Sequence, residues 1–362
     1  MSERKIVHFV HPQKKRNTAG SKAPEDVTQI CNNLGIQGIE MPLFPKDKSK
    51  LIQKIWLLTA AVYAWQKAYR SISKNSVIIY QHPSYAMRVS LRFLRMLQDK
   101  KRCSTIAIVH DLESLRGGIA GVTKTSNKTN AIGDNEFLKS FNVIICHNSH
   151  MREYMIQQGF KAEKLVDLEI FDYLTDAEEL YLTKGEKPSL AIAGNLAAGK
   201  CSYIYDIIKD GNNAGLTMNL YGINFQSEYA NDNMIYHGSF SPEELPGELK
   251  GDFGLVWDGN SADTCAGNTG EYLRFNNPHK TSLYLAAGMP VIVWKQAAIA
   301  DFVIKNGVGI AVDGLSNIEE TIGSVTADEY IEMCKKAREI GLHLRRGYYT
   351  KKAIETALKK IR

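Results

Sequence analysis

One segment in the second half of the chain gathers hydrogen-bond donors at the expected start of a helix. It reads FNNPHKTSLYLAAGMPVIVW, residues 275–294. Pro278 suits the first turn of a helix, because the N–H that proline lacks has no intrahelical partner there. The free N–H groups of that turn, with Lys280, Thr281 and Ser282, are expected to point at one anion. We therefore predict a phosphate or diphosphate site. The alternative is an ordinary helix start with a solvated Lys280.

A second turn that contains glycine and lysine follows another expected strand. GNLAAGKC, residues 194–201, fits the G-x-x-x-x-G-K pattern of P-loop nucleotide sites. Cys201 replaces the hydroxyl that binds magnesium in that motif, and a thiol is a poor magnesium ligand. A P-loop ATPase is therefore the less favoured interpretation. Asn195 and Lys200 are expected to contact a phosphate or ribose instead, and a plain turn into a helix is the remaining alternative.

HDLESLRGG, residues 110–118, follows the expected strand STIAIV and ends in two glycines. A carboxylate at the end of a strand is well placed to take a proton from a sugar hydroxyl. Asp111 is our candidate general base, and Arg116 is a candidate contact to an anionic group. The alternative is that Asp111 caps a helix or pairs with Arg116.

Two further segments are candidates for contacts to a sugar. WDGNSADTCAGNTGEYLRFNN, residues 257–277, is a long glycine-rich connection, and long connections without helical periodicity are usually functional. Its Asp258 is expected to shape the donor pocket. HPQKKRNTAGSKAPED follows the first strand, and Gly20 and Ser21 in it are candidate acceptor contacts. Both segments could instead be solvated loops without chemistry.

The elements that must position these residues alternate between strands and helices. Two series of four short apolar runs, with helical stretches between them, indicate two parallel sheets with crossover helices. The runs are KIVHFV, SVIIYQ, STIAIVHD and NVIICHNS in the first half, and SLAIAGN, LTMNLYG, DFGLVWDG and MPVIVW in the second. We expect an α/β protein with two Rossmann-like domains facing each other across a cleft. Their bounds are predicted at 1–183 and 184–342, with a helix at 343–362 that packs back on the first domain.

Composition excludes several other classes of protein. The chain has 362 residues and a net charge of +6, and its six cysteines occur singly, so we expect reduced, buried thiols and no disulfide framework. The run WLLTAAVYAW at 56–65 is too short to span a bilayer, and the N-terminus lacks a signal-peptide pattern, which predicts a cytoplasmic protein. We expect no nucleic-acid partner, and the oligomeric state, including a homo-oligomer, is left open.

Positive charge is concentrated in the first half. Residues 44–102 hold thirteen Lys or Arg against two acidic residues. A helix expected from Leu51 to Arg70 combines lysines with aromatic and aliphatic residues, a pattern compatible with an anionic membrane surface. Packing of this helix on the sheet is the favoured account.

Several of these motifs, taken together and in order, resemble one family of enzymes. They are HDLESLRGG, IFDYL at 170–174, AGNLAAGKCSYIY at 193–205, FGLVWDGNSADTCAG at 253–267 and EYLRFNNPHKTSLYL at 271–285. They look like the bacterial β-1,6-galactofuranosyltransferases of O-antigen and other surface-polysaccharide assembly. From about His110 onward the resemblance is nearly continuous. More distantly, the chain is similar to streptococcal glucosyltransferases that extend sugars on a serine-rich adhesin.

The resemblance implies a GT-B fold, a UDP-sugar donor and no metal. Lys280, Thr281 and Ser282 would bind the diphosphate with Asn277 and His279 nearby. Asn195 and Lys200 would contact UDP, and Tyr221 would lie against the uridine. The chain contains no D-x-D triplet, which argues against a diphosphate held through a divalent cation. The expected acceptor is an oligosaccharide on a polyprenyl diphosphate lipid, which would bring the enzyme to the inner face of the cell membrane.

Three alternatives to a galactofuranosyltransferase remain open. The first is a transferase that moves glucose or N-acetylglucosamine from its UDP form to a protein. The second is the P-loop ATPase. The third is a subunit that binds a nucleotide sugar and supports another transferase without turnover of its own.

Overall fold

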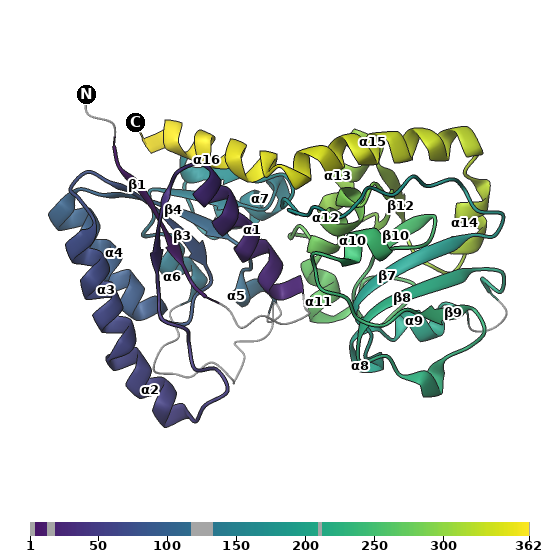
Figure 1. Ribbon diagram of the computed structural model, residues 1–362, viewed down its shortest axis with the longest axis horizontal. Coiled ribbons are helices and arrows are strands. Elements are labelled where there is room, and N and C mark those ends of the chain that lie inside the picture. The colour runs from purple at the N-terminus through teal and green to yellow at the C-terminus, as the bar shows by residue number, and fades with distance from the viewer. Residues whose placement is uncertain (1–3, 13–18, 117–132, 209–211, 362) are drawn as a thin grey trace.

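The computed structural model describes residues 4–12, 19–116, 133–208 and 212–361, which form two parallel sheets covered by helices (Figure 1). Each sheet has six strands within the described residues. The strands of the first sheet are β1 (Ile6–Val10), β2 (Gln37–Glu40), β3 (Val77–His82), β4 (Ser104–Val109), β5 (Val143–Cys146) and β6 (Leu165–Asp167). Those of the second are β7 (Ser189–Asn195), β8 (Thr217–Ile223), β9 (Met234–Tyr236), β10 (Phe253–Val256), β11 (Val291–Trp294) and β12 (Gly309–Val312).

The helices occupy the connections between these strands and the C-terminus. In the first half they are α1 (Ala19–Asn33), α2 (Lys50–Leu58), α3 (Ala60–Ser71), α4 (Met87–Lys101), α5 (Glu113–Arg116), α6 (Asp134–Leu138) and α7 (Ser149–Gln157). In the second half they are α8 (Ala198–Cys201), α9 (Tyr203–Asp206), α10 (Leu245–Glu248), α11 (Gly267–Tyr272), α12 (His279–Ala286), α13 (Ile299–Asn306), α14 (Ile318–Ser324), α15 (Ala327–Arg345) and α16 (Tyr348–Ile361).

The strand orders identify where each sheet can bind a ligand. The second sheet runs β12-β11-β10-β7-β8-β9, which is the Rossmann order. Its chain leaves β7 in one direction, returns to β10 beside β7, and then moves outward in the other direction. The first sheet runs β2-β1-β3-β4-β5-β6, and its direction reverses between β1 and β3. In such sheets ligands bind beyond the carboxyl ends of the strands at the reversal point.

The predicted fold class, an α/β protein with two Rossmann-like domains, is confirmed. All eight strands expected from apolar runs are present, and their cores are buried. Four strands were not expected, namely β2, β6, β9 and β12, and each lies at an edge of its sheet. The six cysteines are free and buried, as expected. No helix of the described part of the chain is long and apolar enough to cross a bilayer.

The two C-terminal helices run across both halves (Figure 1). α15 packs on α12 in the second half, whereas α16 packs on β5, β6 and α1 in the first. Asp172, in the segment that connects the halves, accepts hydrogen bonds from the N–H groups of Tyr349 (3.2 Å) and Thr350 (2.6 Å) at the start of α16. The connecting segment therefore fixes the helix that returns to the first half.

The helix expected from Leu51 to Arg70 is divided at Thr59, and its two parts behave differently. α3 packs as expected: Trp65 is fully buried and its ring lies 4.4 Å from that of Phe9 on β1. α2 contains no buried residue. The favoured expectation, packing on the sheet, is thus correct for α3 and wrong for α2.

Candidate functional site

Lys280 lies at the reversal point of the second sheet. It is in the first turn of α12, and its Nζ donates to the carbonyl of Trp257 (3.2 Å), directly after β10. A Cβ added to Gly194, near the end of β7, would lie 3.8 Å from the same Nζ. The ammonium group is therefore placed between the carboxyl ends of β7 and β10, where the Rossmann topology puts ligands.

The start of α12 adds backbone donors beside this ammonium. The N–H of Thr281 makes the first backbone hydrogen bond of the helix, to Pro278 (3.0 Å). The N–H groups of His279 and Lys280 come before it, and such groups have no intrahelical acceptor. Pro278 itself is the N-cap rather than the first helical residue, with no side-chain cap. A partly buried helix start with a lysine favours an anion.

Two glycines bring the neighbouring strand ends close together beside Lys280. Gly222 on β8 has φ +142°, and a Cβ there would lie only 1.7 Å from the carbonyl oxygen of Gly194. Gly194 is exposed, with φ +139°. Both residues have a positive φ, which favours glycine. At Gly222 a side chain would also collide with Gly194, and at Gly194 its absence leaves the backbone open beside the Lys280 ammonium.

The 194–201 turn does not form a P-loop. α8 is only four residues long, and the Cys201 thiol is buried and donates to the carbonyl oxygens of Asn195 (3.1 Å) and Ala197 (3.3 Å). Burial raises the pKa of this thiol to about 11, so it stays protonated at neutral pH. The Asn195 side chain accepts from Ala197 N (3.1 Å) and from Asn224 Nδ2 (3.0 Å), which shapes the turn.

Lys200 and Asp258 also lie around this turn. The charges of Lys280, Asp258 and Lys200 all act on the Cys201 thiol, so the four residues are neighbours. Lys200 is exposed, whereas Lys280 is half-buried. The carboxylate of Asp258 accepts from its neighbour Gly259 N (2.9 Å) and from Thr269 Oγ1 (3.1 Å). The structure therefore brings Asn195, Lys200, Asp258 and Lys280 to one edge.

The 257–277 connection is not free of helix, contrary to expectation. Its second part forms α11, which packs against α5 of the first half. Tyr272, the last residue of α11, is buried, and its hydroxyl accepts a hydrogen bond from the N–H of Leu112 (3.0 Å). The same hydroxyl hydrogen-bonds to the carboxyl group of Asp111. No role for Tyr272 was predicted from the sequence, because a single tyrosine in a polar segment is a weak signal.

Asp111 has a pKa suited to proton transfer near neutral pH. Burial by the surrounding protein raises its pKa to about 6, although the adjacent Arg116 guanidinium and the Tyr272 hydrogen bond act in the opposite direction. The side chain is still 32% exposed, so an acceptor hydroxyl can reach it. Arg116 Nη1 lies 3.0 Å from Asp111 and 3.8 Å from Glu113. The ion pair between Asp111 and Arg116, which was the alternative interpretation, is therefore present. It engages the guanidinium group of Arg116 that was expected to contact an anion.

Asn277 connects the two halves in this structure. Its Nδ2 donates to the carbonyls of His147 (2.6 Å) and Glu169 (3.1 Å), and its Oδ1 accepts from Asn148 Nδ2 (2.7 Å). Its N–H donates to His147 Nδ1 (2.9 Å). The side chain is buried and its polar atoms are satisfied. Asn277 therefore fixes the start of α12 to the first half, and here it has no group left for UDP.

The hydroxyls that follow Lys280 are equally inaccessible. Ser282 donates to the carbonyl of Phe171 (2.6 Å) and is 1% exposed. Thr281 is fully buried, and its hydroxyl has no hydrogen-bond partner among the described residues. In this conformation neither hydroxyl can contact a diphosphate, so the predicted contribution of Thr281 and Ser282 is reduced to the backbone of the turn.

His279 is neutral and has a defined tautomer. Burial lowers the pKa of this imidazole to about 4. Its Nε2 lies 3.3 Å from the carbonyl oxygen of Asp172, and because that oxygen can only accept, Nε2 carries the proton. Nδ1 is then an acceptor. A phosphate oxygen also only accepts, and Nδ1 is buried without a partner among the described residues, so in this conformation the imidazole cannot bond to a diphosphate.

Tyr221 is placed in the core. It is 1% exposed, its ring stacks on His237 (4.7 Å), and its hydroxyl donates to Glu248 O (3.1 Å) and accepts from Lys250 N (2.8 Å). The ring therefore has no open face against which uridine could lie in this structure.

The candidate acceptor contacts lie at the start of α1. Gly20 is in its first turn, and the Ser21 side chain is buried. The next residue, Lys22, is also buried and pairs with Asp26 (2.7 Å), and its Nζ donates to Leu174 O (2.6 Å). Residues 13–18 of the same loop lie outside the described residues. Within the described ranges, no group of three or more His, Cys, Asp or Glu side chains is arranged to hold a metal ion.

Comparisons with known proteins place the chain in a family. Residues 4–170 match the N-terminal domain, and residues 190–357 the C-terminal domain, of the glucosyltransferase 3-like family. The chain is 32% identical over 353 residues to the β-1,6-galactofuranosyltransferase WbbI of Escherichia coli, covering 95% of each protein. It is 26% identical to glucosyltransferase 3 of Streptococcus gordonii, covering 94% of each. The resemblance expected from the motifs is confirmed.

Solved structures agree on the fold. Anabaena HepE, in complex with UDP and glucose, superimposes with a TM-score of 0.59 at 13% identity and covers 98% of this chain and 99% of its own. The sucrose-phosphate synthase of Thermosynechococcus elongatus gives a TM-score of 0.64 at 12% identity, with 99% of each chain covered. The chain belongs to the glucosyltransferase 3-like family and is a glycosyltransferase of GT-B fold.

Proposed function

We propose that this enzyme transfers galactofuranose from UDP-galactofuranose to a sugar acceptor in a β-1,6 linkage, for bacterial surface-polysaccharide synthesis. The single observation that most supports a UDP-sugar donor is the position of Lys280 at the β7/β10 reversal point, beside the start of α12. The choice of sugar is supported by the 32% identity to the galactofuranosyltransferase WbbI over nearly the whole chain.

The proposed reaction is a single displacement. An acceptor hydroxyl oxygen attacks the anomeric carbon, its proton passes to the Asp111 carboxylate, and the bond from that carbon to the diphosphate breaks. UDP leaves with the bonding electron pair. Because UDP-galactofuranose has an α linkage, one displacement produces the β product. Asp111 and α11 meet where the two halves contact each other, so a base from one half can act on a sugar held by the other.

Lys280 and the N–H groups of α12 are proposed to stabilise the charge of the leaving diphosphate. A lysine contact contributes about 1.5 to 3 kcal/mol and a helix start about 0.3 to 1 kcal/mol. Together they can neutralise the leaving group without a metal ion. The proposed acceptor is an oligosaccharide on a polyprenyl diphosphate lipid, so the reaction would occur at the cytoplasmic face of the membrane.

A donor panel tests this proposal. The protein is incubated with UDP-galactofuranose, UDP-galactopyranose, UDP-glucose or UDP-N-acetylglucosamine and a glucoside acceptor, with and without EDTA. We expect turnover with UDP-galactofuranose that EDTA does not reduce. Turnover only with UDP-glucose would favour the second candidate, a glucosyltransferase, which the 26% identity to streptococcal glucosyltransferase 3 supports. Loss of activity in EDTA would overturn the metal-independent mechanism.

A further inference from the structure

The first half presents an apolar helix face for which the donor and acceptor sites give no explanation. On α2, Leu51, Ile52, Ile55 and Leu58 are 67%, 46%, 52% and 67% exposed. Their spacing of one, four and seven residues places them on one face of the helix. Large aliphatic side chains grouped on an exposed face usually mark an interaction surface.

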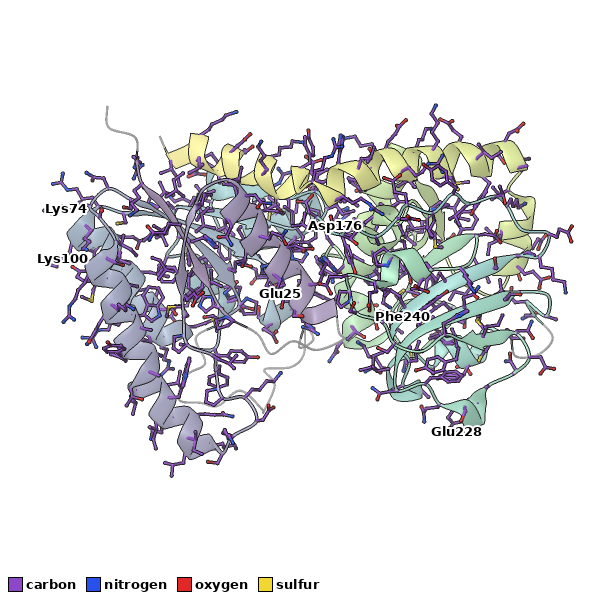
Figure 2. All side chains as sticks on the ribbon, in the orientation of Figure 1. Glu25, Lys74, Lys100, Asp176, Glu228 and Phe240 are labelled. Carbon is purple, nitrogen blue, oxygen red and sulfur yellow. The ribbon has the colours of Figure 1, made fainter. Side chains whose placement is uncertain are left out.

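Positive charge surrounds this face. Lys46, Lys48, Lys50 and Lys54 are exposed on α2 and the segment before it. Figure 2 shows two further lysines of this basic stretch, Lys74 and Lys100, at the ends of α3 and α4 that are far from α2, so they lie outside the α2 face. Residues 44–102 contain only two acidic residues, so the region lacks the mixed charges of an ordinary solvated surface.

Three aromatic rings hold α2 beside the start of α4. Phe44 stacks on Tyr85, which comes two residues before α4, with centroids 4.3 Å apart and an interplanar angle of 11°. Phe44 also meets Trp56 of α2 edge-on, with centroids 5.1 Å apart. The exposed face of α2 and the first turns of α4 therefore belong to one region of the surface, at the lower end of the first half in Figure 1.

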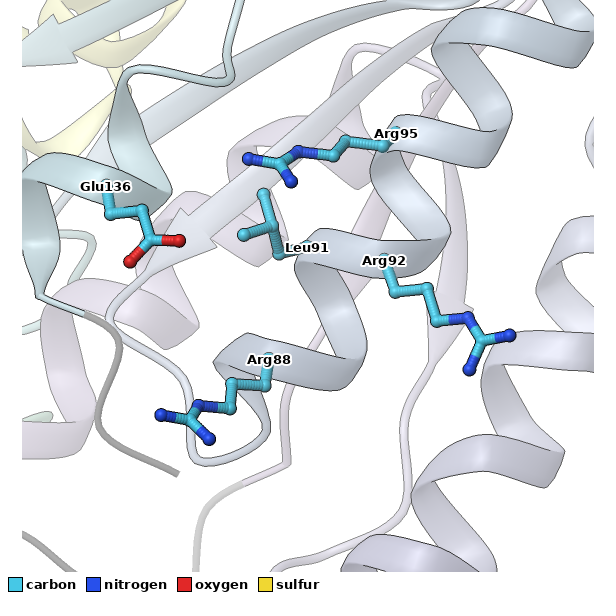
Figure 3. Close-up of a pocket in the computed structure, with 5 residues that line it drawn as sticks. All are labelled: Arg88, Leu91, Arg92, Arg95 and Glu136. Atoms are coloured by element: carbon cyan, nitrogen blue, oxygen red, sulfur yellow. The ribbon is translucent and has the colours of Figure 1, made fainter. Parts of the chain in front are cut away.

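α4 adds arginines to that region. Arg88, Leu91, Arg92 and Arg95, with Glu136 of α6, line a cavity of about 430 Å³. Figure 3 shows Arg88 and Arg95 extending toward the helix that holds Glu136, whereas Arg92 extends to the other side of α4. Among the described residues, neither Arg92 nor Arg95 has an ion-pair partner within 4 Å. Guanidinium groups of this kind suit phosphate oxygens.

We propose that this region is a docking surface for an anionic phospholipid bilayer. The aliphatic face of α2 enters the interface between head groups and acyl chains, while Arg92, Arg95 and the α2 lysines contact lipid phosphates. Apolar burial and basic attraction together are what hold a helix in the plane of a membrane. The positive charge is the reason for choosing a bilayer over a second copy of this chain, whose net charge is also positive. The inference does not depend on the identity of the donor sugar.

Vesicle flotation tests the surface. The full-length protein is mixed with vesicles of phosphatidylcholine alone, or of phosphatidylcholine with phosphatidylglycerol. We expect binding only to the second kind, weakened by salt. The double variant L51S/L58S should lower the partition coefficient on the order of 100-fold, because two leucines lose their burial in lipid. The double variant R92Q/R95Q should lower it about 30-fold.

Matched controls come from the second half. Ile331 on α15 is 54% exposed, which is similar to the 52% exposure of Ile55. Lys335 on the same helix is also exposed. The double variant I331S/K335Q should bind vesicles like the wild type. K50Q/K54Q gives a further test that disturbs no packed side chain, and it should also lower binding about 30-fold. Melting curves and UDP affinity verify that each variant is folded.

Three results would overturn the proposal. The first is equal or absent binding of the wild type to both kinds of vesicle. The second is vesicle binding as strong as that of the wild type for K50Q/K54Q, and also for L51S/L58S and R92Q/R95Q where these variants fold. The third is a change of molar mass in analytical ultracentrifugation for L51S/L58S with unaltered vesicle binding, which would show that the face joins copies of the chain. A protein that docks on vesicles but transfers no galactofuranose would refute only the proposed function.

Discussion

The facing edges of the two sheets differ in charge and in how their key residues are held. At the edge of the second sheet, the Lys280 ammonium contacts a carbonyl, lies beside a glycine and has no ion-pair partner among the described residues. At the edge of the first sheet, the Asp111 carboxylate is partly buried, paired with Arg116 and bonded to Tyr272. One edge is thus suited to receive an anion, and the other to receive a proton.

The difference indicates a division of labour between the halves. Lys280 can bind an anion as it is, because a lysine side chain is positively charged at neutral pH. The carboxylate needs a pKa high enough to take a proton, and burial by the surrounding protein provides it. Tyr272 of the second half also hydrogen-bonds to this carboxylate, whereas Lys280, Trp257 and Gly194 at the anion site all belong to the second half.

The largest effect is expected at Asp111. Asp111→Asn keeps the shape of the side chain but cannot accept the proton, so kcat should fall roughly 100- to 10,000-fold. UDP affinity, which belongs to the other edge, should not change. Steady-state kinetics and calorimetry measure the two quantities. Glu113→Gln, at an exposed neighbour, is the matched control. A normal kcat in Asp111→Asn would remove this residue from the role of base.

The glycine pair beside Lys280 should be the next most sensitive feature. Gly222→Ala forces a Cβ onto the Gly194 carbonyl and into an unfavourable φ, so the free energy of unfolding should fall by at least about 3 kcal/mol. Gly199→Ala, where an added Cβ meets nothing within 4 Å, should change it by less than about 1 kcal/mol. Urea denaturation measures both. Equal stability of the two variants would contradict the close approach of these strand ends.

The two lysines at the donor edge, Lys280 and Lys200, should contribute unequally to the affinity for UDP. Lys280→Ala is expected to weaken UDP binding by about 2 kcal/mol, or roughly 30-fold in Kd. Lys200→Ala, which removes an exposed side chain, should cost less than about 1 kcal/mol. Isothermal titration calorimetry with UDP compares them directly. A larger loss in Lys200→Ala would move the anion site from the start of α12 to the 194–201 turn.

The smallest effect concerns pH. Asp111 must be ionised to accept a proton, so kcat/KM should be high above its pKa of about 6 and decline as the pH falls below it. The Tyr272 hydrogen bond lowers this pKa, so Tyr272→Phe should move the acid limb to higher pH. The pH profile of kcat/KM records the shift. An acid limb unchanged in Tyr272→Phe would separate Asp111 from the pH dependence.

The sequence predicted the inner strands and not the outer ones, for a physical reason. Inner strands are covered on both faces and read as continuous apolar runs, such as VIIY in β3. The edge strands have only three or four residues and are less completely buried: β2 reads QGIE and is largely exposed, and β9 contains no buried residue. Only pairing with a neighbour makes these segments strands, and that pairing is not visible in local pattern.

The candidate site was predictable to the extent that it depends on strand ends and helix starts. The topology brings Gly194 and Lys280 together, and both were selected from local motifs. The roles of Asn277, His279, Ser282 and Tyr221 depend instead on partners distant in the chain, such as His147 and Phe171. The contact of Tyr272 with Leu112 spans 160 residues. No local pattern could have shown which polar groups these side chains already satisfy.

The most direct test is a crystal structure of the protein soaked with UDP. We predict that the diphosphate oxygens lie within hydrogen-bond distance of Lys280 Nζ and of the N–H groups at the start of α12, between the ends of β7 and β10. A diphosphate bound away from residue 280, or held on the first half of the chain, would contradict the assignment of the donor site.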